Sequence, residues 1–464
     1  MFWIAKCVCV LLLSVMLSAC ITTDENERPE INYADSYQQM GTEADADIDV
    51  NWWQAFHSPA LNEMMQLADR QSPDVLISAE RVRQAELQMN IANATLFPSL
   101  NASASSGERR TKADGDAAAT SGSTSASLSV SYEVDLWGGI AAGRKSAKAG
   151  YDATRFDQEA ALLSIKAAIA SGWFQWLALQ ERIATTQKNI VIAERVQKVV
   201  DARYRNGAAT AAEVAQQKTN LLTQQASLLP LALQARQTRS ALAILLGKTP
   251  QEFALPESKL LDVVVPEIAP GTPAELITRR PDLAAREATL IAANADIIQT
   301  RAAMLPGISL GATVSESASE LFNLNPATQA AGWSLSLAQS LFNGGRVLNQ
   351  KRLSEARRAE LLLQYHKSIL VALQEVDTAL ASADVSRKQE NNLQEILVQA
   401  ELSMRLTEAR YRAGSDDLLE LLVVQRSLFQ AKDTLVQQRQ ARLNTAVDLY
   451  KALGGGWVLA KSEY

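Results

Sequence analysis

Two short charged segments, each ending in a glycine, hold the side chains best placed for chemistry. Ala202-Arg203-Tyr204-Arg205-Asn206-Gly207 returns 207 residues later as Ala409-Arg410-Tyr411-Arg412-Ala413-Gly414, and three carboxylates follow the second copy. Arginines and carboxylates at this spacing can form ion pairs, and a group of carboxylates can attract cations. The candidate residues are Arg203, Tyr204, Arg205, Gly207, Arg410, Tyr411, Arg412, Gly414, Asp416, Asp417 and Glu420.

Each candidate has an ordinary structural interpretation beside the functional one. Asp416 and Asp417 follow a glycine turn and open a helical pattern, where they can cap the helix and complement its dipole. In an oligomer, copies of Asp416 can instead converge in a ring that attracts cations. The arginines can be last-turn cations on a solvated face, or they can pair with a neighbouring segment. The sequence leaves both interpretations open for each group.

The rest of the chain contains no pattern that points to catalysis. His57 and His366 stand apart from each other and from every cysteine, whereas a metal site needs clustered ligands. No glycine-rich segment has the GxxxxGK[ST] pattern of a phosphate-binding loop, and no Ser/His/Asp set can be assembled. The formal net charge of -6 and the pI near 5.3 argue against a nucleic-acid partner. We expect no enzymatic activity, no metal site and no cofactor.

The two charged segments belong to a duplication that covers most of the chain. Pro73-Asp74 matches Pro281-Asp282, and Leu246-Gly247 matches Leu453-Gly454, at shifts close to 207 residues. A period of this length indicates a duplicated structural unit and not a solenoid repeat. We expect repeat 1 at residues 61–249, a linker at 250–275, repeat 2 at 276–454 and a C-terminal tail at 455–464.

The N-terminus predicts export and a lipid anchor. Lys6 precedes an apolar stretch that ends in Leu17-Ser18-Ala19-Cys20, which resembles the lipobox of bacterial lipoproteins. We therefore expect a signal peptide at residues 1–19, acyl chains on Cys20 and a lipid-anchored segment at 20–60. Ile21 is not the aspartate that signals inner-membrane retention in such lipoproteins, which indicates the outer membrane. The alternative is an ordinary secretory signal in which Cys20 stands by chance.

Four segments alternate between apolar and polar residues, and they predict strands near 98–107, 124–137, 306–316 and 331–342. Each is close to the roughly 9 to 11 residues that a tilted strand needs to cross a bilayer. The alternation fits a barrel with an apolar exterior and a polar lumen, or a soluble sheet with one wet face. The small polar residues 107–123 are expected to form an exposed loop. We expect no transmembrane helix after the signal, because no apolar run of about 18 residues is evident.

Long helices are expected near 61–97, 139–247, 276–305 and 345–453. No proline occurs between Gly139 and Pro230, and good helix formers dominate this stretch. Asn206-Gly207 is a helix stop, so each long helical region is expected to turn back at its charged segment. Each repeat then supplies one continuous and one composite helical column.

Four strands cannot close into a barrel by themselves, and open sheet edges are not tolerated in hydrocarbon. Two chains would give roughly eight strands, a barrel filled by its own side chains, whereas three would give about twelve and leave a conduit. We therefore expect an α+β membrane channel, an obligate trimer in which a 12-stranded transmembrane β-barrel continues into a 12-helix α-barrel.

Several motifs, by their order, spacing and duplication, resemble the TolC-type outer membrane efflux proteins. They are Trp52-Trp53, Asp135-Leu136-Trp137-Gly138, Arg280-Pro281-Asp282-Leu283, Leu341-Phe342-Asn343-Gly344-Gly345 and both Ala-Arg-Tyr-Arg segments. The resemblance covers essentially the whole chain after the signal. It is closest to the lipoprotein branch that serves resistance-nodulation-division (RND) pumps.

The resemblance implies a homotrimer whose barrel lies among outer membrane lipids and whose helical tunnel extends into the periplasm. It implies the exit duct of a tripartite efflux system, which passively conducts drugs or other small toxic compounds from an inner-membrane RND pump and a periplasmic membrane-fusion adaptor. In that family the helical tips close the periplasmic aperture and contact the adaptor. The gate candidates are Tyr411, Asp416, Asp417 and Glu420, and the adaptor-contact candidates are Arg203, Tyr204, Arg205, Gly207, Arg410, Arg412 and Gly414.

The sequence departs from the lipoprotein branch at Val423, where an aspartate is common. A second acidic ring would need Asp417 or Glu420, or the gate rests on Asp416 alone. Two other functions stay open: an exit duct for type I protein secretion and, in a different class, a lipid-anchored periplasmic coiled-coil scaffold without a pore.

Overall fold

The computed structural model describes residues 48–112, 114, 117–268, 273 and 276–457. These residues form two compact units, each drawn from both repeats. The strand unit contains the described residues of 85–153 and 286–366, and the helical unit contains those of 48–84, 154–285 and 367–457. Cys20, residues 1–47 and the end of the C-terminal tail lie outside the described residues.

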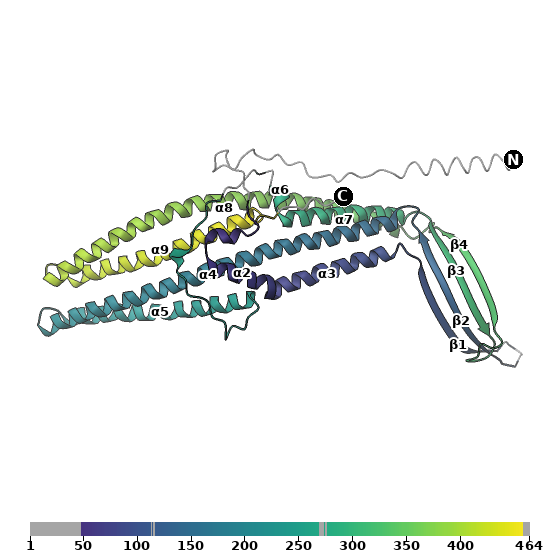
Figure 1. The fold of residues 1–464 in the computed structure, drawn as a ribbon, viewed down its shortest axis with the longest axis horizontal. Coiled ribbons are helices and arrows are strands. Elements are labelled where there is room, and N and C mark those ends of the chain that lie inside the picture. The colour runs from purple at the N-terminus through teal and green to yellow at the C-terminus, as the bar shows by residue number, and fades with distance from the viewer. Residues whose placement is uncertain (1–47, 113, 115–116, 269–272, 274–275, 458–464) are drawn as a thin grey trace. The chain divides into compact units, whose positions relative to one another are not determined.

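The strand unit contains one antiparallel sheet whose strands lie side by side in chain order (Figure 1). The strands are β1 (Ser99–Thr111), β2 (Ala119–Val134), β3 (Gly307–Ala318) and β4 (Thr328–Ala338). The register pairs Leu128 with Val314 and Leu310 with Leu335, so apolar side chains share one face. Both β1 and β4 are edge strands in the single chain.

The first hairpin is longer than the apolar alternation predicts. Residues 107–123 were expected to form a loop, yet β1 continues to Thr111 and β2 begins at Ala119, which pairs with Thr111. These residues are small and polar and carry no apolar alternation, which is why the pattern missed them. Pairing across the hairpin holds them instead, as where Ser121 lies opposite Arg109 and its hydroxyl donates to the Arg109 carbonyl oxygen at 3.5 Å.

The helices repeat almost residue for residue. They are α2 (Pro59–Gln71), α3 (Pro73–Ala94), α4 (Gly139–Arg205), α5 (Ala211–Leu245), α6 (Leu276–Arg279), α7 (Pro281–Ala302), α8 (Arg346–Ala413) and α9 (Leu418–Ala452), with short 3-10 turns η1 (Trp52–Phe56) and η2 (Leu260–Asp262). α3 and α7 have 22 residues each, α5 and α9 have 35 each, and α4 and α8 have 67 and 68. The structure therefore contains the duplication that the motifs indicated.

Two expected helices are interrupted. The single helix expected over 61–97 is α2 and α3, and the one expected over 276–305 is α6 and α7. The break falls before Pro73 in one repeat and before Pro281 in the other, because proline disfavours the helical conformation in the residue that precedes it. Ser72 accordingly has extended angles, with φ -62 and ψ 124.

The break in each repeat is contacted by the glycine that ends the returning helix. Gly247 and Gly454 have φ of +66 and +87, and a Cβ atom on either one would overlap a main-chain oxygen, that of Gln71 or of Arg279. Only glycine permits both the left-handed conformation and this close approach. The end of α5 thus abuts the start of α3, as the composite column required.

The core of the helical unit lies where η1 and α2 pack against α4 and α9. Trp52 stacks on Tyr450 with ring centroids 5.2 Å apart, and Phe56 lies 5.0 Å from Phe174. Trp52, Phe56 and Phe174 are each at most 2 % exposed. The aromatic residues of η1 therefore pack the start of the described chain against α4 and α9.

One described helix, α4, contains a stretch that is long and apolar enough to cross a membrane, which the sequence analysis did not single out. By length and composition alone such a stretch is weak evidence, and 44 % of it is buried in the structure. Trp173 and Phe174 of α4 belong to the core just described. Packing explains the apolar character of this helix.

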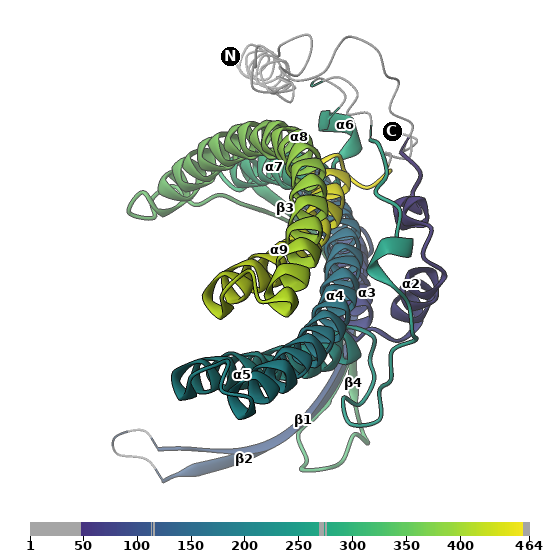
Figure 2. The same cartoon turned by 90° about the vertical axis from the view of Figure 1, so that its left-hand side faces the viewer.

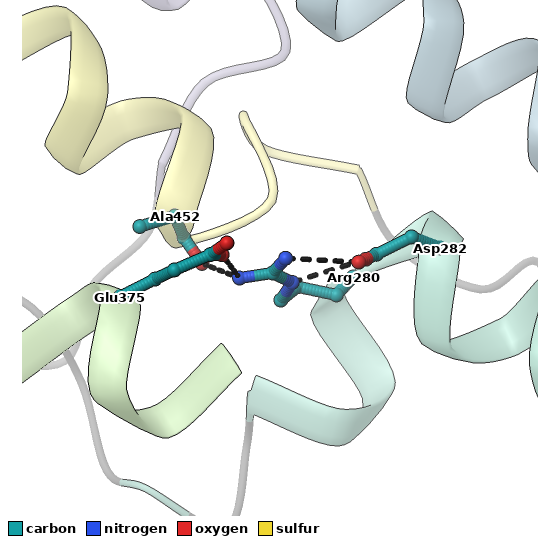
Figure 3. A network of polar contacts seen from close by, with 4 residues as sticks. All are labelled: Arg280, Asp282, Glu375 and Ala452. Carbon is teal, nitrogen blue, oxygen red and sulfur yellow. Dashed lines mark hydrogen bonds and ion pairs between the residues drawn. The ribbon is translucent and has the colours of Figure 1, made fainter. Parts of the chain in front are cut away.

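A buried arginine joins three helices in the second repeat (Figure 3). Arg280 donates to Asp282 at 2.8 and 3.0 Å, to Glu375 of α8 at 2.6 Å and to the carbonyl oxygen of Ala452 in α9 at 3.2 Å. Burial acts to lower the pKa of Arg280, but the two carboxylates more than offset this and raise it. The equivalent position in the first repeat is Ser72, so only the second repeat has this clamp.

Candidate functional site at the two helical tips

Both charged segments lie where a long helix ends and turns back, at the same end of the helical unit (Figures 1 and 2). Gly207 and Gly414 have φ of +72 and +80. The amide of Ala208 donates to the Arg203 carbonyl at 2.8 Å, and the amide of Ser415 donates to Arg410 at 3.0 Å. These bonds are the helix-ending pattern that a left-handed glycine allows. The segments therefore form two equivalent tips, which we call tip 1 (α4–α5) and tip 2 (α8–α9).

The returning helices are capped differently at the two tips. In tip 1, Thr210 and Glu213 form a capping box, with bonds of 3.2 and 2.6 Å. In tip 2, the Asp417 carboxylate accepts a 2.9 Å bond from the amide of Glu420. The capping interpretation holds for Asp417. The Thr-x-x-Glu spacing of this capping box is visible in the sequence.

The two tips are joined by Arg203 and Tyr411. The Arg203 guanidinium donates to the main-chain carbonyl oxygen of Tyr411 at 3.0 Å and also reaches the Ala208 carbonyl at 3.4 Å. It lies over the Tyr411 ring, 4.7 Å from the centroid, in a cation-π arrangement. Arg203 is in α4 and Tyr411 is in α8, so one side chain holds two hairpins together.

Tyr411 is buried in an apolar cluster that both hairpins build. It is 2 % exposed, and residues such as Val196 and Val200 of α4 and Leu421 of α9 pack in the same cluster. Among the described residues, its hydroxyl has no hydrogen-bond partner. Burial raises the pKa of the Tyr411 phenol, which the nearby Arg203 partly offsets. The ring therefore contributes to packing as a neutral group.

Asp416 does not cap the helix. Its carboxylate lies 3.2 Å from Nε of Arg410, an arginine whose side chain is 62 % exposed. Arg412 pairs with Glu408 one turn earlier on the same helix. The charge of Asp416, whose side chain is 19 % exposed, is therefore only partly compensated, because its partner is a solvated surface group.

The remaining candidates lie apart from this contact. Arg205 donates to the Asp201 carbonyl of its own helix at 3.4 Å, and the side chain of Tyr204 is 49 % exposed. Glu420 is exposed as well. Of the residues singled out from the sequence, the structure brings Arg203 and Tyr411 together across the hairpins and leaves the others on their own tips.

Further polar contacts between the hairpins carried no signal in the sequence. Arg182 of α4 forms a two-bonded ion pair with Asp433 of α9, at 2.6 and 3.2 Å. Asn220 of α5 donates to Gln425 of α9 at 3.0 Å. Each pair joins residues more than 200 positions apart. Within the part of the chain that the structure describes, no group of three or more His, Cys, Asp or Glu residues could hold a metal ion.

A sheet with two unpaired edges, attached to two long helical hairpins of equal design, defines a subunit of an oligomeric membrane channel. The sequence pattern of the family described as "Outer membrane efflux protein" matches residues 64–248 and 272–455. The two matches coincide with the two repeats. The chain belongs to this outer membrane efflux protein family.

Individual proteins are similar over nearly the whole chain. The Pyoverdine export outer membrane protein OpmQ of Pseudomonas putida is 38 % identical, with 97 % of each chain covered. The outer membrane protein OprJ of Pseudomonas aeruginosa is 32 % identical, covering 97 % of this chain and 96 % of OprJ. The MtrE outer membrane channel of Neisseria gonorrhoeae superposes with a TM-score of 0.82 at 25 % identity, covering 94 % of this chain and 98 % of MtrE.

The family resemblance drawn from the motifs is confirmed. This chain is an outer membrane efflux channel of the kind that serves RND pumps, and it extends into the periplasm. Its fold is that of the trimeric channels in which a β-barrel continues into a helical barrel. The lipid on Cys20 and the roles of the tip residues remain predictions.

Proposed function

We propose that three copies of this chain form the exit duct of a tripartite efflux system. Small molecules enter from an inner-membrane RND pump through a periplasmic adaptor and leave to the exterior. The observation that supports this is the contact of Arg203 with Tyr411, which ties the two helical tips to each other. A duct needs an end that can be closed and released, and this contact lies at the end of both hairpins.

Release of the tips is compatible with the energies involved. A charge-assisted hydrogen bond and a cation-π contact near the surface are together worth about 2 kcal/mol. An adaptor whose binding free energy favours the open tips over the closed tips by a similar amount would shift the equilibrium toward the open channel. We propose that the adaptor contacts a surface formed by the arginines of both tips together with Tyr204, Gly207 and Gly414. We propose that Asp416 forms the acidic ring, with Asp417 engaged as a helix cap.

The proposed cargo is a small molecule and not a secreted protein. The Pseudomonas putida relative is named for pyoverdine export, and it is the more identical of the two relatives described above. We propose that this chain exports a small metabolite or drug, with a siderophore of the pyoverdine kind as the first compound to test. Because a duct passes what its pump delivers, the pump sets the choice among such compounds.

Two measurements test this proposal. The purified protein, reconstituted in a planar bilayer, should conduct ions as a trimer, whereas a periplasmic scaffold would not. In the native host, deletion of the gene should retain siderophore in the periplasm and raise drug susceptibility without changing the set of secreted proteins. Loss of a secreted protein with normal siderophore export would favour the type I secretion duct and contradict the proposal.

We also propose that Cys20 is the lipidated first residue of the mature chain, on the strength of Leu17-Ser18-Ala19-Cys20. Intact-mass measurement should show a chain that begins at Cys20 and carries acyl groups. In Cys20→Ala the acyl mass should be lost. A mature wild-type chain that starts elsewhere, or carries no lipid, would contradict it.

A further inference from the structure

One face of the sheet is lined with hydroxyl groups. Three serines of β1 lie opposite three serines of β2, and the hydroxyls of each pair are 2.8 to 2.9 Å apart. The pairs are Ser99 with Ser131, Ser103 with Ser127 and Ser105 with Ser125. The register continues this face through Ser309, Thr313, Ser315 and Ser317 of β3 to Ser334 and Ser336 of β4. Since the opposite face is apolar, the hydroxyl face is the one that lines the lumen of the family's barrel.

Two charged residues interrupt this face over the four strands. Glu133 stands near the end of β2, opposite Ser309, and Arg109 stands in β1 opposite Ser121. Twelve positions of β2 separate Ser121 from Glu133, a distance of about 40 Å at 3.3 Å per residue. The two charges are therefore too far apart to neutralise each other. The other strand carboxylates, Glu108 and Glu316, alternate onto the apolar face.

The next carboxylate along the chain is already engaged. Asp135 accepts hydrogen bonds from the amides of Ile140 and Ala141, at 3.0 and 2.8 Å, and so caps the start of α4. Glu133 is exposed and, among the described residues, has no hydrogen-bond or ion-pair partner. Its negative charge is thus uncompensated by the protein and available to ions in the lumen.

The second repeat does not duplicate this charge. The shift of 206 residues that relates Gly138 to Gly344 places Gln339 at the position of Glu133. Gln339 is neutral, and its amide donates to the Met304 carbonyl oxygen at 3.0 Å. Each chain therefore contributes one carboxylate at this level, and a trimer contributes one from each copy.

We propose that Glu133 sets the ion preference of the barrel lumen. Its copies form a carboxylate ring at the helix-proximal end of a passage that hydroxyl groups otherwise line. Carboxylates at the wall of a narrow, low-dielectric passage raise the local concentration of cations and slow anions. The hydroxyls offer hydrogen bonds to cargo of either charge. The lumen accordingly favours neutral and cationic hydrophilic molecules over anionic ones. This inference rests on the proposed duct function.

The test is the reversal potential of the reconstituted trimer in a planar bilayer under a KCl gradient. All variants carry Asp416→Asn, so that the acidic residue of the tip does not mask the lumen. Glu133→Gln should move the reversal potential toward zero, Glu133→Lys should move it to the anion-selective side, and Glu133→Asp should keep the preference for cations.

Glu316→Gln is the matched control, because Glu316 is a strand carboxylate on the apolar face and accepts a 2.8 Å bond from Gln329. It should leave the reversal potential unchanged. A conducting channel whose selectivity is the same in Glu133→Gln as in the parent overturns this inference alone, and so does an equal shift in Glu316→Gln. Absence of conductance in the unmutated chain would instead overturn the duct function.

Discussion

Arg203 of α4 and Tyr411 of α8 are joined twice, by a 3.0 Å hydrogen bond to the tyrosine carbonyl and by a guanidinium 4.7 Å from the ring centroid. The two residues occupy different positions within the repeated Ala-Arg-Tyr-Arg segment: Arg203 precedes the tyrosine of its own tip, and Tyr411 is the tyrosine of the other. The duplicated segment therefore supplies both partners of the contact. An arginine of tip 1 binds a tyrosine of tip 2, and both residue types occur in each copy of the segment.

Arg203→Ala should raise the open fraction of the channel. It removes both contacts with Tyr411, and a loss of about 1 to 2 kcal/mol corresponds to a roughly 5- to 30-fold change in the ratio of open to closed tips. Single-channel recording in planar bilayers would measure it. Arg205→Ala is the control, since the Arg205 side chain donates to a carbonyl of its own helix. An equal effect of the two variants would argue against the contact between Arg203 and Tyr411.

Asp416→Ala should raise single-channel conductance, whereas Asp417→Ala should not. The charge of Asp416 is only partly compensated by a solvated arginine, whereas the Asp417 carboxylate accepts the hydrogen bond of the Glu420 amide. The Asp417 variant loses the helix cap, which should instead lower the free energy of unfolding by about 1 kcal/mol. Unchanged conductance in Asp416→Ala would remove Asp416 from the gate.

Tyr411→Phe should behave like the parent at neutral pH and differ from it in strong alkali. The buried phenol has a raised pKa, so it favours the packed tip while neutral, and that contribution is lost as the pH rises past the ordinary value of about 10. Conductance of the parent should therefore increase above about pH 10, and Tyr411→Phe should lack that increment. A pH profile of channel opening for both proteins checks this, and identical profiles would contradict it.

Arg280→Ala should destabilise the second repeat. It leaves the Ala452 carbonyl without its donor and removes the bridge to Glu375, although the carboxylates, which are close to half exposed, stay solvated. We expect a loss of about 1 to 3 kcal/mol, seen as a lower melting temperature by circular dichroism in detergent. Arg301→Ala breaks a 4.0 Å surface pair with Glu355 and should change the melting temperature little. Equal melting of Arg280→Ala and the parent would mean that the clamp carries no stability.

Much of this architecture could be predicted from local patterns, because the strands alternate and the long helix α4 contains no proline. The ends of the first hairpin could not, since residues such as Gly107 and Ser123 pair across strands without any apolar pattern. The capping role of Asp417 was readable from its place after a glycine turn. The burial of Tyr411 was not, because part of the apolar cluster around it, Val196 and Val200, comes from a helix roughly two hundred residues away.

The two glycine joints set how closely the pieces of each column stack. At Gly247 and at Gly454 one helix end meets the next helix start so closely that a Cβ atom would lie 2.2 or 1.9 Å from a main-chain oxygen. Any larger residue would have to push the two pieces apart, so each glycine fixes the spacing at which its column is assembled.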